Sequence, residues 1–384
     1  MTTSSLTGLC AARAFATGPA AGVVETLAGA LLDGLGARPA STVMYFASSQ
    51  YDPRELAGPL SARFPGACVI GCSTSGEFTD EQTGTGTVTA IALPQGMLLR
   101  SYAALGELSD NPSAGTDAAI AAVEAELGSS LRGLDPARYL GFVLIDGMHG
   151  AEELVNERIG NAAPVLDFVG GSAGDDLAFQ STWVAVGDQI SHQGVAILVA
   201  EAGVPFHVVK TCSFTPSGAV LRITDADVET RTVRKFDGRP AVEAYAQALG
   251  LEPDQVDASA FMAHPVGLLI DGEPWIRSPQ MVTPDGGIRF YAQILEGMEV
   301  EVMNAGDLVS ETRIAIDEAR SELGGRATGA VMFNCILRRL EMDAKQTSKP
   351  FLEVFSGIPL AGFHTYGETW LGHMNQTLTG VVFG

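Results

Sequence analysis

The sequence predicts an α/β protein with a two-domain, mixed-sheet architecture, built from a repeated module of strand, helix, strand, glycine-rich loop and strand. Three observations support this fold class. Short apolar runs of strand length recur along the 384 residues and alternate with helix-like stretches. A glycine-rich segment follows several of these runs. The length is that of two or three ordinary domains, at roughly 100–200 residues each.

The first copy of the module lies near the N-terminus. An apolar run at residues 41–47 predicts a strand, and residues 53–64 read as a helix. A second short run at 68–70 enters the glycine-rich segment GCSTSGE at 71–77. The β-prone run TVTAIAL at 87–93 then predicts the closing strand.

The same order recurs from residue 139. YLGFVLID at 139–146 predicts a strand, and AEELVNERIG at 151–160 predicts a helix. LDFV at 166–169 is a second strand, followed by the glycine-rich loop GGSAGDD at 170–176. GVAILVA at 194–200 closes this copy.

A third copy is predicted near the C-terminus. AVMFNCIL at 330–337 reads as a strand, a helical stretch runs through residue 355, and LAGFHTYGE at 360–368 precedes the strand LTGVVF at 378–383. α/β proteins commonly read strand, helix, strand and glycine, so chance resemblance between the copies stays an alternative, while the unequal spacings argue against a solenoid. The loops of the first and third copies match at four positions each: Gly71, Thr74, Gly76 and Glu77 with Gly362, Thr365, Gly367 and Glu368.

The repeated order of strand, helix and glycine-rich loop is interrupted near residues 214–225, which include the segment FTPSG. The stretch 223–250 then reads as a strand, a turn at Asp237-Gly238 and a helix opened by Pro240. Two further strand signals follow at 266–272 and 288–294. The turn residues Asp285-Gly286-Gly287 indicate a hairpin, so this part has more antiparallel character.

These breaks divide the chain into three predicted segments. Residues 1–38 form an N-terminal helical lead-in, residues 39–222 a first α/β domain, and residues 223–384 a second.

The amino-acid composition excludes several classes of binding partner. The chain carries 23 Lys and Arg against 45 Asp and Glu, a net charge of −22, although 46% of its residues are hydrophobic. This excludes a disordered acidic tail, and it predicts no binding to nucleic acid or to a membrane surface, because both are anionic. No apolar run approaches the roughly 20 residues of a membrane span. Five scattered cysteines and an N-terminus without signal-peptide features predict a cytoplasmic protein.

Glycine-rich loops after strands are where α/β proteins place ligands, because glycine exposes backbone N–H groups to a bound anion. The alternative is that these glycines only turn the chain, and none of the loops matches a nucleotide-binding motif. Asp175 and Asp176 could hold a cation or act as acid and base, but one of two adjacent carboxylates more often caps a turn.

The cysteines suggest two further possibilities. The spacing of Cys68 and Cys72 does not fit a zinc site. Cys335 precedes Arg338 and Arg339, whose charges would lower the pKa of a nearby thiol. A thiol-dependent enzyme using Cys335 or Cys72 is therefore one alternative, and a buried, inert cysteine is the other.

Of the six histidines, His264 stands at a strand entrance and His373 lies between the third glycine-rich loop and the last strand, so both could reach a ligand. Each can equally be a structural histidine. A metal-binding imidazole needs its second nitrogen held by a partner, and Asn375 and Gln376 are placed to orient His373.

Seven sequence blocks carry a resemblance to a known family: YDPRELAGPL, VIGCSTSGE, LIDGMHGAEELV, GGSAGDD, AHPVGLLIDGEPWIRS, CILRRLE and GFHTYGETWLGHMNQTLTGVVFG. In their order and spacing, from about residue 43 to 384, they resemble the FIST sensory domain, and among its members most of all the bacterial nitric-oxide-sensing haem proteins called NosP. His149 and Ser75 depart from the family's usual residues.

The resemblance implies FIST N-type and C-type domains in a cytoplasmic sensor that is not an enzyme. NosP-type proteins bind haem b non-covalently, sense nitric oxide, and regulate a partner histidine kinase or a cyclic-di-GMP enzyme, that is, a diguanylate cyclase or phosphodiesterase. The wider family implies the alternative of a non-haem sensor for a small molecule such as an amino acid. His264 and His373 match the histidine-bearing blocks and are the predicted haem ligands, and no other metal is expected. The remaining ligand-pocket candidates are Gly71, Cys72, Ser73, Gly170, Gly171, Ser172, Asp175, Cys335, Arg338, Tyr366 and Glu368.

Overall fold

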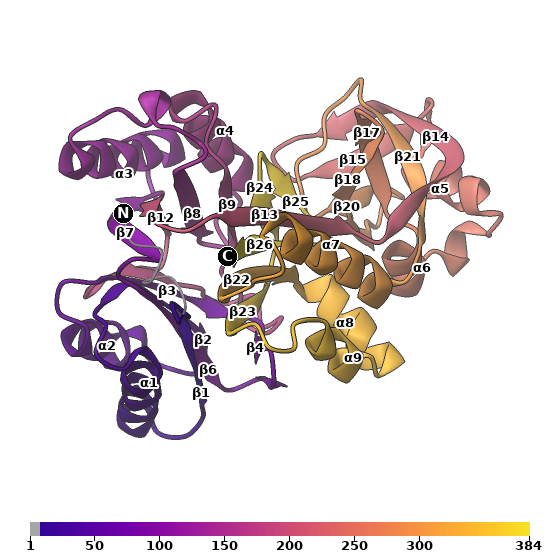
Figure 1. Cartoon of the computed structure of the whole chain (residues 1–384). Helices are drawn as coiled ribbons and strands as arrows, with labels where there is room; N and C mark the ends of the chain where they lie inside the picture. Colours follow the sequence, from indigo (N-terminus) through magenta and orange to yellow (C-terminus); the bar gives the residue numbers. More distant parts are fainter. Residues whose placement is uncertain (1–7) are drawn as a thin grey trace.

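The computed structural model describes residues 8–384 and confirms the predicted mixed α/β fold (Figure 1). Its core consists of three modules with the same order of elements. The first contains β1 (Ala12–Ala16), α1 (Ala20–Leu35), β2 (Ala40–Ser48), α2 (Ala57–Arg63), β3 (Cys68–Thr74), β4 (Glu77–Thr79), β5 (Thr83–Gly84) and β6 (Val88–Pro94). The second contains β7 (Leu98–Glu107), α3 (Pro112–Leu127), β8 (Tyr139–Ile145), α4 (Glu152–Ala162), β9 (Phe168–Ser172), β10 (Val184–Val186), β11 (Gln189–Ser191) and β12 (Gly194–Ala202).

The third module is interrupted by an inserted domain. The module contains β13 (Phe206–Cys212), α7 (Leu308–Glu322), β22 (Gly329–Cys335), α8 (Ile336–Lys345), α9 (Ser348–Val354), β23 (Leu360–Thr365), β24 (Glu368–Trp370), β25 (His373–Met374) and β26 (Thr377–Phe383). The inserted domain contains β14 (Phe214–Asp227), β15 (Thr232–Phe236), β16 (Arg239–Pro240), α5 (Ala241–Leu249), α6 (Ala258–Ala263), β17 (Val266–Ile270), β18 (Glu273–Arg277), β19 (Pro279–Val282), β20 (Ile288–Phe290) and β21 (Glu299–Ala305). It lies to the right in Figure 1 and is antiparallel throughout.

The predicted segments differ from this grouping in detail. The lead-in of residues 1–38 includes strand β1, which pairs with β6, as well as α1, and its first seven residues lie outside the described part. The boundary placed between residues 222 and 223 falls within β14. The third-copy strand ends at Cys335 because α8 begins at Ile336. The turn at residues 285–287 does join an antiparallel pair, β19 and β20.

The pairing within each module is identical. The two strands that flank the second helix, β2 and β3, β8 and β9, β22 and β23, are parallel neighbours. The last strand pairs antiparallel with the first of these two in every module. The three-copy pattern predicted from the sequence is therefore a structural repeat.

A short hairpin of each module also pairs with the sheet of a neighbouring module. Strand β4 of the first module adds to β23 of the third, β24 of the third adds to β9 of the second, and β10 of the second adds to β3 of the first. The modules thus form a closed ring with approximate threefold symmetry. Three matching backbone hydrogen bonds join the loops at its centre: Ser75 N to His364 O, Tyr366 N to Ser172 O, and Gly174 N to Ser73 O.

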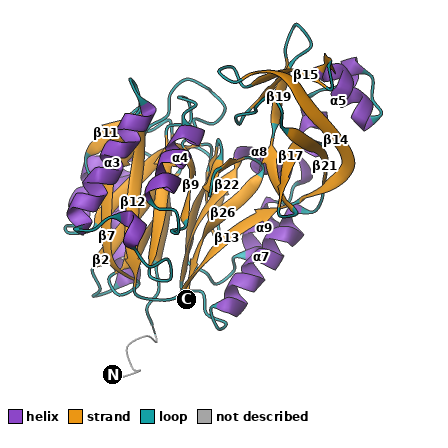
Figure 2. Ribbon diagram, turned by 90° about the horizontal axis from the view of Figure 1, so that it is seen from above, coloured by secondary structure: helices purple, strands orange, loops and turns teal. Residues whose placement is uncertain are grey.

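Apolar side chains fill the space between the three sheets. Phe46 on β2, Phe142 on β8 and Phe333 on β22 belong to one buried cluster and come from matching strands. Helices cover the outer faces, and Figure 2 shows α7 along the sheet that contains β13, β26 and β22. Burial of the inner and outer faces accounts for strands that are apolar along their whole length.

Two buried glutamates occupy matching positions in the first and third modules. Glu77 accepts hydrogen bonds from the Thr74 and Thr87 hydroxyls, and Glu368 accepts them from Thr365 and Thr377. Burial disfavours the carboxylate form and raises the pKa of Glu77 to about 8 and that of Glu368 to about 7.

These pKa values predict a pH-dependent stability. Above about pH 5 the unfolded chain has lost these two protons, whereas the folded protein keeps the Glu368 proton up to about pH 7 and the Glu77 proton up to about pH 8. Unfolding in this range therefore releases protons. The free energy of unfolding should therefore fall as the pH rises through this range. Urea titrations at pH 5.5 and pH 8 measure this fall in the free energy of unfolding. The fall should be smaller for the double variant Glu77→Gln/Glu368→Gln than for the wild type. Equal falls in both proteins would contradict this assignment.

Candidate ligand-binding site

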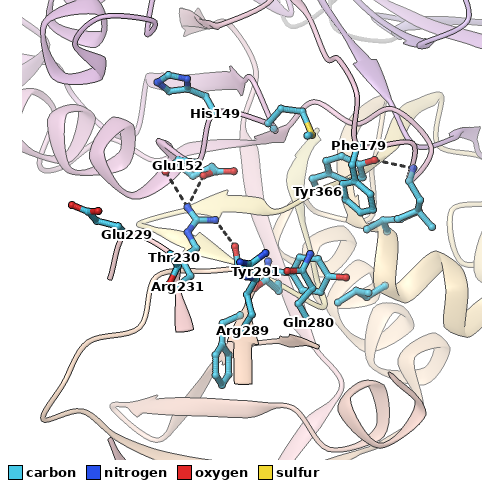
Figure 3. Close-up of a pocket in the computed structure, with 18 residues that line it drawn as sticks. His149, Glu152, Phe179, Glu229, Thr230, Arg231, Gln280, Arg289, Tyr291 and Tyr366 are labelled. Atoms are coloured by element: carbon cyan, nitrogen blue, oxygen red, sulfur yellow. Dashed lines mark hydrogen bonds and ion pairs between the residues drawn. The ribbon is translucent and has the colours of Figure 1, made fainter. Parts of the chain in front are cut away.

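A cavity with a volume of 470 Å³ lies between the second module, the third module and the inserted domain. Figure 3 shows its side chains converging from these three parts of the chain. The second module contributes the loop before α4 and the first residue of α4, and the inserted domain contributes β19, β20 and the turn before β15. The third module contributes the start of α8 together with Tyr366 and Asn375. Its lining residues include His149, Glu152, Phe179, Glu229, Thr230, Arg231, Gln280, Arg289, Tyr291, Ile336, Leu337, Tyr366 and Asn375.

Arg231 links the inserted domain to the second module across one side of the cavity. Its guanidinium donates to Glu152 at 2.8 Å and to Glu153 at 2.7 Å, both at the start of α4, and to the carbonyl oxygen of Tyr291 at 2.5 Å. Burial alone would lower the pKa of Arg231, but the two carboxylates more than offset it and raise the pKa. Arg231 itself has a positive φ of 52°. We refer to this arrangement of Arg231, Glu152 and Glu153 as the Arg231 latch.

The opposite wall is held by Tyr366. Its hydroxyl donates to Asp175 and accepts from the backbone N–H of Leu177 at 2.8 Å, while its ring stacks on Phe179 with centroids 5.3 Å apart. Asp175 also accepts from three backbone N–H groups of the loop that follows it. Asp175 is thus a turn-capping residue, and its hydrogen bonds, opposed by burial, lower its pKa.

Two charged side chains and one amide nitrogen of the cavity have no ion-pair or hydrogen-bond partner among the described residues. Arg289 and Glu229 form no ion pair within residues 8–384. Asn375 is buried, its side-chain oxygen accepts from the Ser278 backbone N–H at 3.4 Å, and its Nδ2 makes no hydrogen bond. A buried donor without a partner costs free energy, so a ligand atom that accepts from Asn375 would be stabilising.

Of the predicted ligand-pocket residues, Tyr366 lines this cavity and the others lie elsewhere. The glycines of these loops lack a side chain, and this allows the neighbouring strands to approach closely. A Cβ on Gly71 would meet the Tyr45 ring at 2.5 Å, and one on Gly170 would lie 1.8 Å from the Val143 oxygen. Gly171, Ser73 and Ser172 are likewise buried in the interlocked loops, where Ser73 Oγ accepts from the Trp183 N–H.

The predicted thiols are buried in apolar surroundings. Cys72 belongs to the central core, and Cys335 lies beneath Tyr291 and Tyr366. Burial raises the pKa of both thiols well above the usual value. The expected lowering of the Cys335 pKa by arginine is outweighed by burial and by the nearby charge of Glu368. The Arg338 guanidinium donates hydrogen bonds to Asn334 and Thr312. Neither thiol is poised as a nucleophile.

The two predicted haem ligands lie outside the cavity lining, where the one histidine is His149. His264 places Nδ1 3.1 Å from the Met303 carbonyl oxygen. His373 is buried, and neither of its ring nitrogens has a hydrogen-bond partner in the described part of the chain. Its ring packs so closely against Gly367 that a Cβ there would lie 2.0 Å away. Its pKa is lowered by burial, against the opposing charges of Glu153 and Glu152.

Seven of the lining residues that were not predicted come from the inserted domain, among them Arg231, Arg289 and Tyr291. They are far in sequence from the glycine-rich loops, and no local pattern marks their approach to α4. His149 was visible as a departure from the family's usual residue. Within residues 8–384 there is no group of three or more His, Cys, Asp or Glu side chains arranged to hold a metal ion. The helices of that same range include none with the length and apolar character of a membrane span.

Comparison with known proteins gives a family for both halves. Residues 41–239 match the FIST N domain and residues 241–370 match the FIST C domain. An uncharacterized protein of Mycobacterium bovis is 29% identical over 169 residues, and one of Mycobacterium tuberculosis is 25% identical over 167 residues. Each alignment covers 40% of this chain, and the chain spans 42% and 43% of those two proteins. A crystal structure of chorismatase aligns with 97% of this chain and 98% of its own, at 11% identity and a TM-score of 0.35.

Proposed function

The chain belongs to the FIST family, whose domains are sensors of signal transduction that bind small ligands, and from this we propose that it senses a small zwitterionic molecule such as an amino acid. The proposed site is the cavity between α4, the inserted domain and α8. The observation that carries the proposal is the set of unpaired polar groups on its wall. Arg289 and Asn375 offer donors to a carboxylate, and Glu229 offers an acceptor to an ammonium group.

The Arg231 latch supports a sensory role. A ligand can shift a conformational equilibrium only if it interacts differently with the two states. A carboxylate in the cavity would compete with Glu152 and Glu153 for Arg231, which joins the inserted domain to α4. Binding would then be reported as a change in the position of the inserted domain.

A thermal-shift screen with the twenty amino acids tests the proposal. A bound ligand at about 100 times its Kd adds about 2.7 kcal/mol of stability. At least one amino acid should therefore raise the Tm of the wild-type protein. The variants Arg289→Gln and Asn375→Leu should weaken its binding roughly tenfold or more, because a hydrogen bond to a charged group contributes about 1.5–3 kcal/mol.

The matched control is Arg313→Gln, at an exposed arginine on α7 without an ion pair among the described residues. It should bind the ligand like the wild type. A screen in which no amino acid raises the Tm would reject the proposed ligand class. Binding that is unchanged in Arg289→Gln and Asn375→Leu would place the site outside this cavity.

Haem b and nitric oxide sensing remain predictions, and the arrangement at the two predicted ligands does not fit haem. A haem ligand needs an open apolar slot beside the imidazole. His373 is instead enclosed by Gly367 and faces the charges of Glu153 and Arg277, and His264 lies away from the cavity. Adding haemin to the purified protein should therefore produce no shift of the Soret band in its absorption spectrum. A shift that His373→Ala or His264→Ala abolishes would restore the haem assignment.

The partner also stays a prediction. Regulation of a histidine kinase, or of a diguanylate cyclase or phosphodiesterase, would follow from a ligand-dependent position of the inserted domain. The net charge of −22 favours a basic contact surface on such a partner.

A further inference from the structure

A second cavity of 210 Å³ lies where the β4–β5 hairpin of the first module meets α8 and α9 of the third. It shares no lining residue with the first cavity. The two cavities occupy matching places in the ring, each between the hairpin of one module and the helix that follows the first parallel strand of its neighbour. Thr85 stands two residues before the threonine that donates to Glu77, as Asn375 does before the threonine that donates to Glu368.

The second cavity contains a buried imidazole with a fixed proton. Arg338 Nε donates to Asn334 Oδ1 at 2.8 Å, which sets the orientation of that amide. Asn334 Nδ2 therefore donates to His364 Nδ1 at 2.9 Å, and the ring proton of His364 is on Nε2. Burial lowers the pKa of His364 to about 3, so the ring stays neutral. His364 is 2% exposed, lines the cavity, and its Nε2 has no protein partner among the described residues.

Arg339 supplies a charged donor beside this imidazole. Its Nη1 is engaged with the Ser75 oxygen at 2.7 Å and with Asp176 at 2.6 Å. Its Nε lies 3.4 Å from Asp343, whose side chain is 52% exposed. A long, exposed ion pair contributes little to stability, so an incoming carboxylate can replace Asp343.

The remaining wall is apolar and is formed by Met342, Phe351 and Leu352. We propose that this second cavity binds a small monocarboxylic acid with an apolar body. The carboxylate accepts hydrogen bonds from His364 Nε2 and Arg339 Nε, and the apolar body packs against Phe351 and Leu352. The donor network is set before the ligand arrives, since Arg338 and Asn334 hold the imidazole in one tautomer.

Calorimetric titration with benzoate tests this site, with benzyl alcohol as the matched compound that lacks the carboxylate. The wild-type protein should bind benzoate with a Kd of about 1 mM or tighter. Benzyl alcohol should bind it roughly tenfold more weakly, because it lacks the charge that strengthens both hydrogen bonds. His364→Phe, which keeps the ring stacked on Phe78 but has no N–H, should weaken benzoate binding by a similar factor.

His207→Phe is the matched control, because His207 lies on β13 and lines neither cavity. It should bind benzoate like the wild type. If His364→Phe does not fold, Arg339→Gln and a nitrogen NMR spectrum of wild-type histidines give independent readings. Benzoate should shift the His364 Nε2–H resonance. Failure of benzoate to bind, equal binding of benzyl alcohol, equal binding by the variants, or an unmoved resonance would each overturn the proposal.

Discussion

Gly170→Ala should destabilise the folded protein more strongly than any other of the proposed substitutions. Gly170 on β9 faces Val143 on the parallel strand β8, and an added Cβ would lie 1.8 Å from the Val143 carbonyl oxygen. No side-chain rotation relieves a contact between a Cβ and the backbone, so the strands would have to separate at the centre of the ring. We expect a loss of more than about 4 kcal/mol of unfolding free energy, measured by urea denaturation.

The same substitution at Gly160 is the control. Gly160 is exposed on α4, and an added Cβ there meets no atom within 4 Å. Gly160→Ala should raise the stability by about 0.5–1 kcal/mol, since alanine favours the helix. A Gly170→Ala protein with a Tm close to that of the wild type would show that the ring tolerates wider strand spacing.

Arg338→Met should be the second most damaging substitution. Arg338 is 1% exposed and donates to Asn334 and to Thr312, at 2.8 Å and 2.7 Å. Removing the guanidinium leaves buried acceptors without a donor and removes a positive charge near Glu368. Breaking such a buried network from one side costs about 3–5 kcal/mol.

Arg313→Met on the exposed face of α7 should change the unfolding free energy by less than about 0.5 kcal/mol. Urea titrations of both variants measure the difference. Comparable stabilities for the two would mean that Arg338 is not needed to satisfy Asn334 and Thr312.

The sequence predicts the elements of the fold better than their assembly. The parallel strands are short, apolar and followed by glycine, so periodicity finds all three copies. The exchanged hairpins are not predictable in this way. β10 pairs with β3 from the first module, more than 100 positions away in the chain, and its three residues have no pattern that selects this neighbour.

The candidate site was predictable only in part, for a similar reason. A glycine-rich loop after a strand can either bind an anion or allow two strands to pack closely, and the sequence does not distinguish the two. The short distances from an added Cβ at Gly71 and Gly170 to neighbouring atoms favour close strand packing. Tyr366 was predicted because it belongs to the C-terminal sequence block that carries the family resemblance. Arg231 and Arg289 belong to the inserted domain, and their approach to α4 depends on how that domain packs.

The exchange of hairpins also bears on how such a core can assemble. In the ring every module completes the sheet of another, which is the arrangement of a domain-swapped homotrimer. Three separate chains would depend on concentration to meet. Three tandem copies in one chain are held at a high effective concentration, so assembly becomes an intramolecular event. Covalent fusion also frees each copy to diverge, which allows one of them to carry an inserted domain while the other two keep an uninterrupted module.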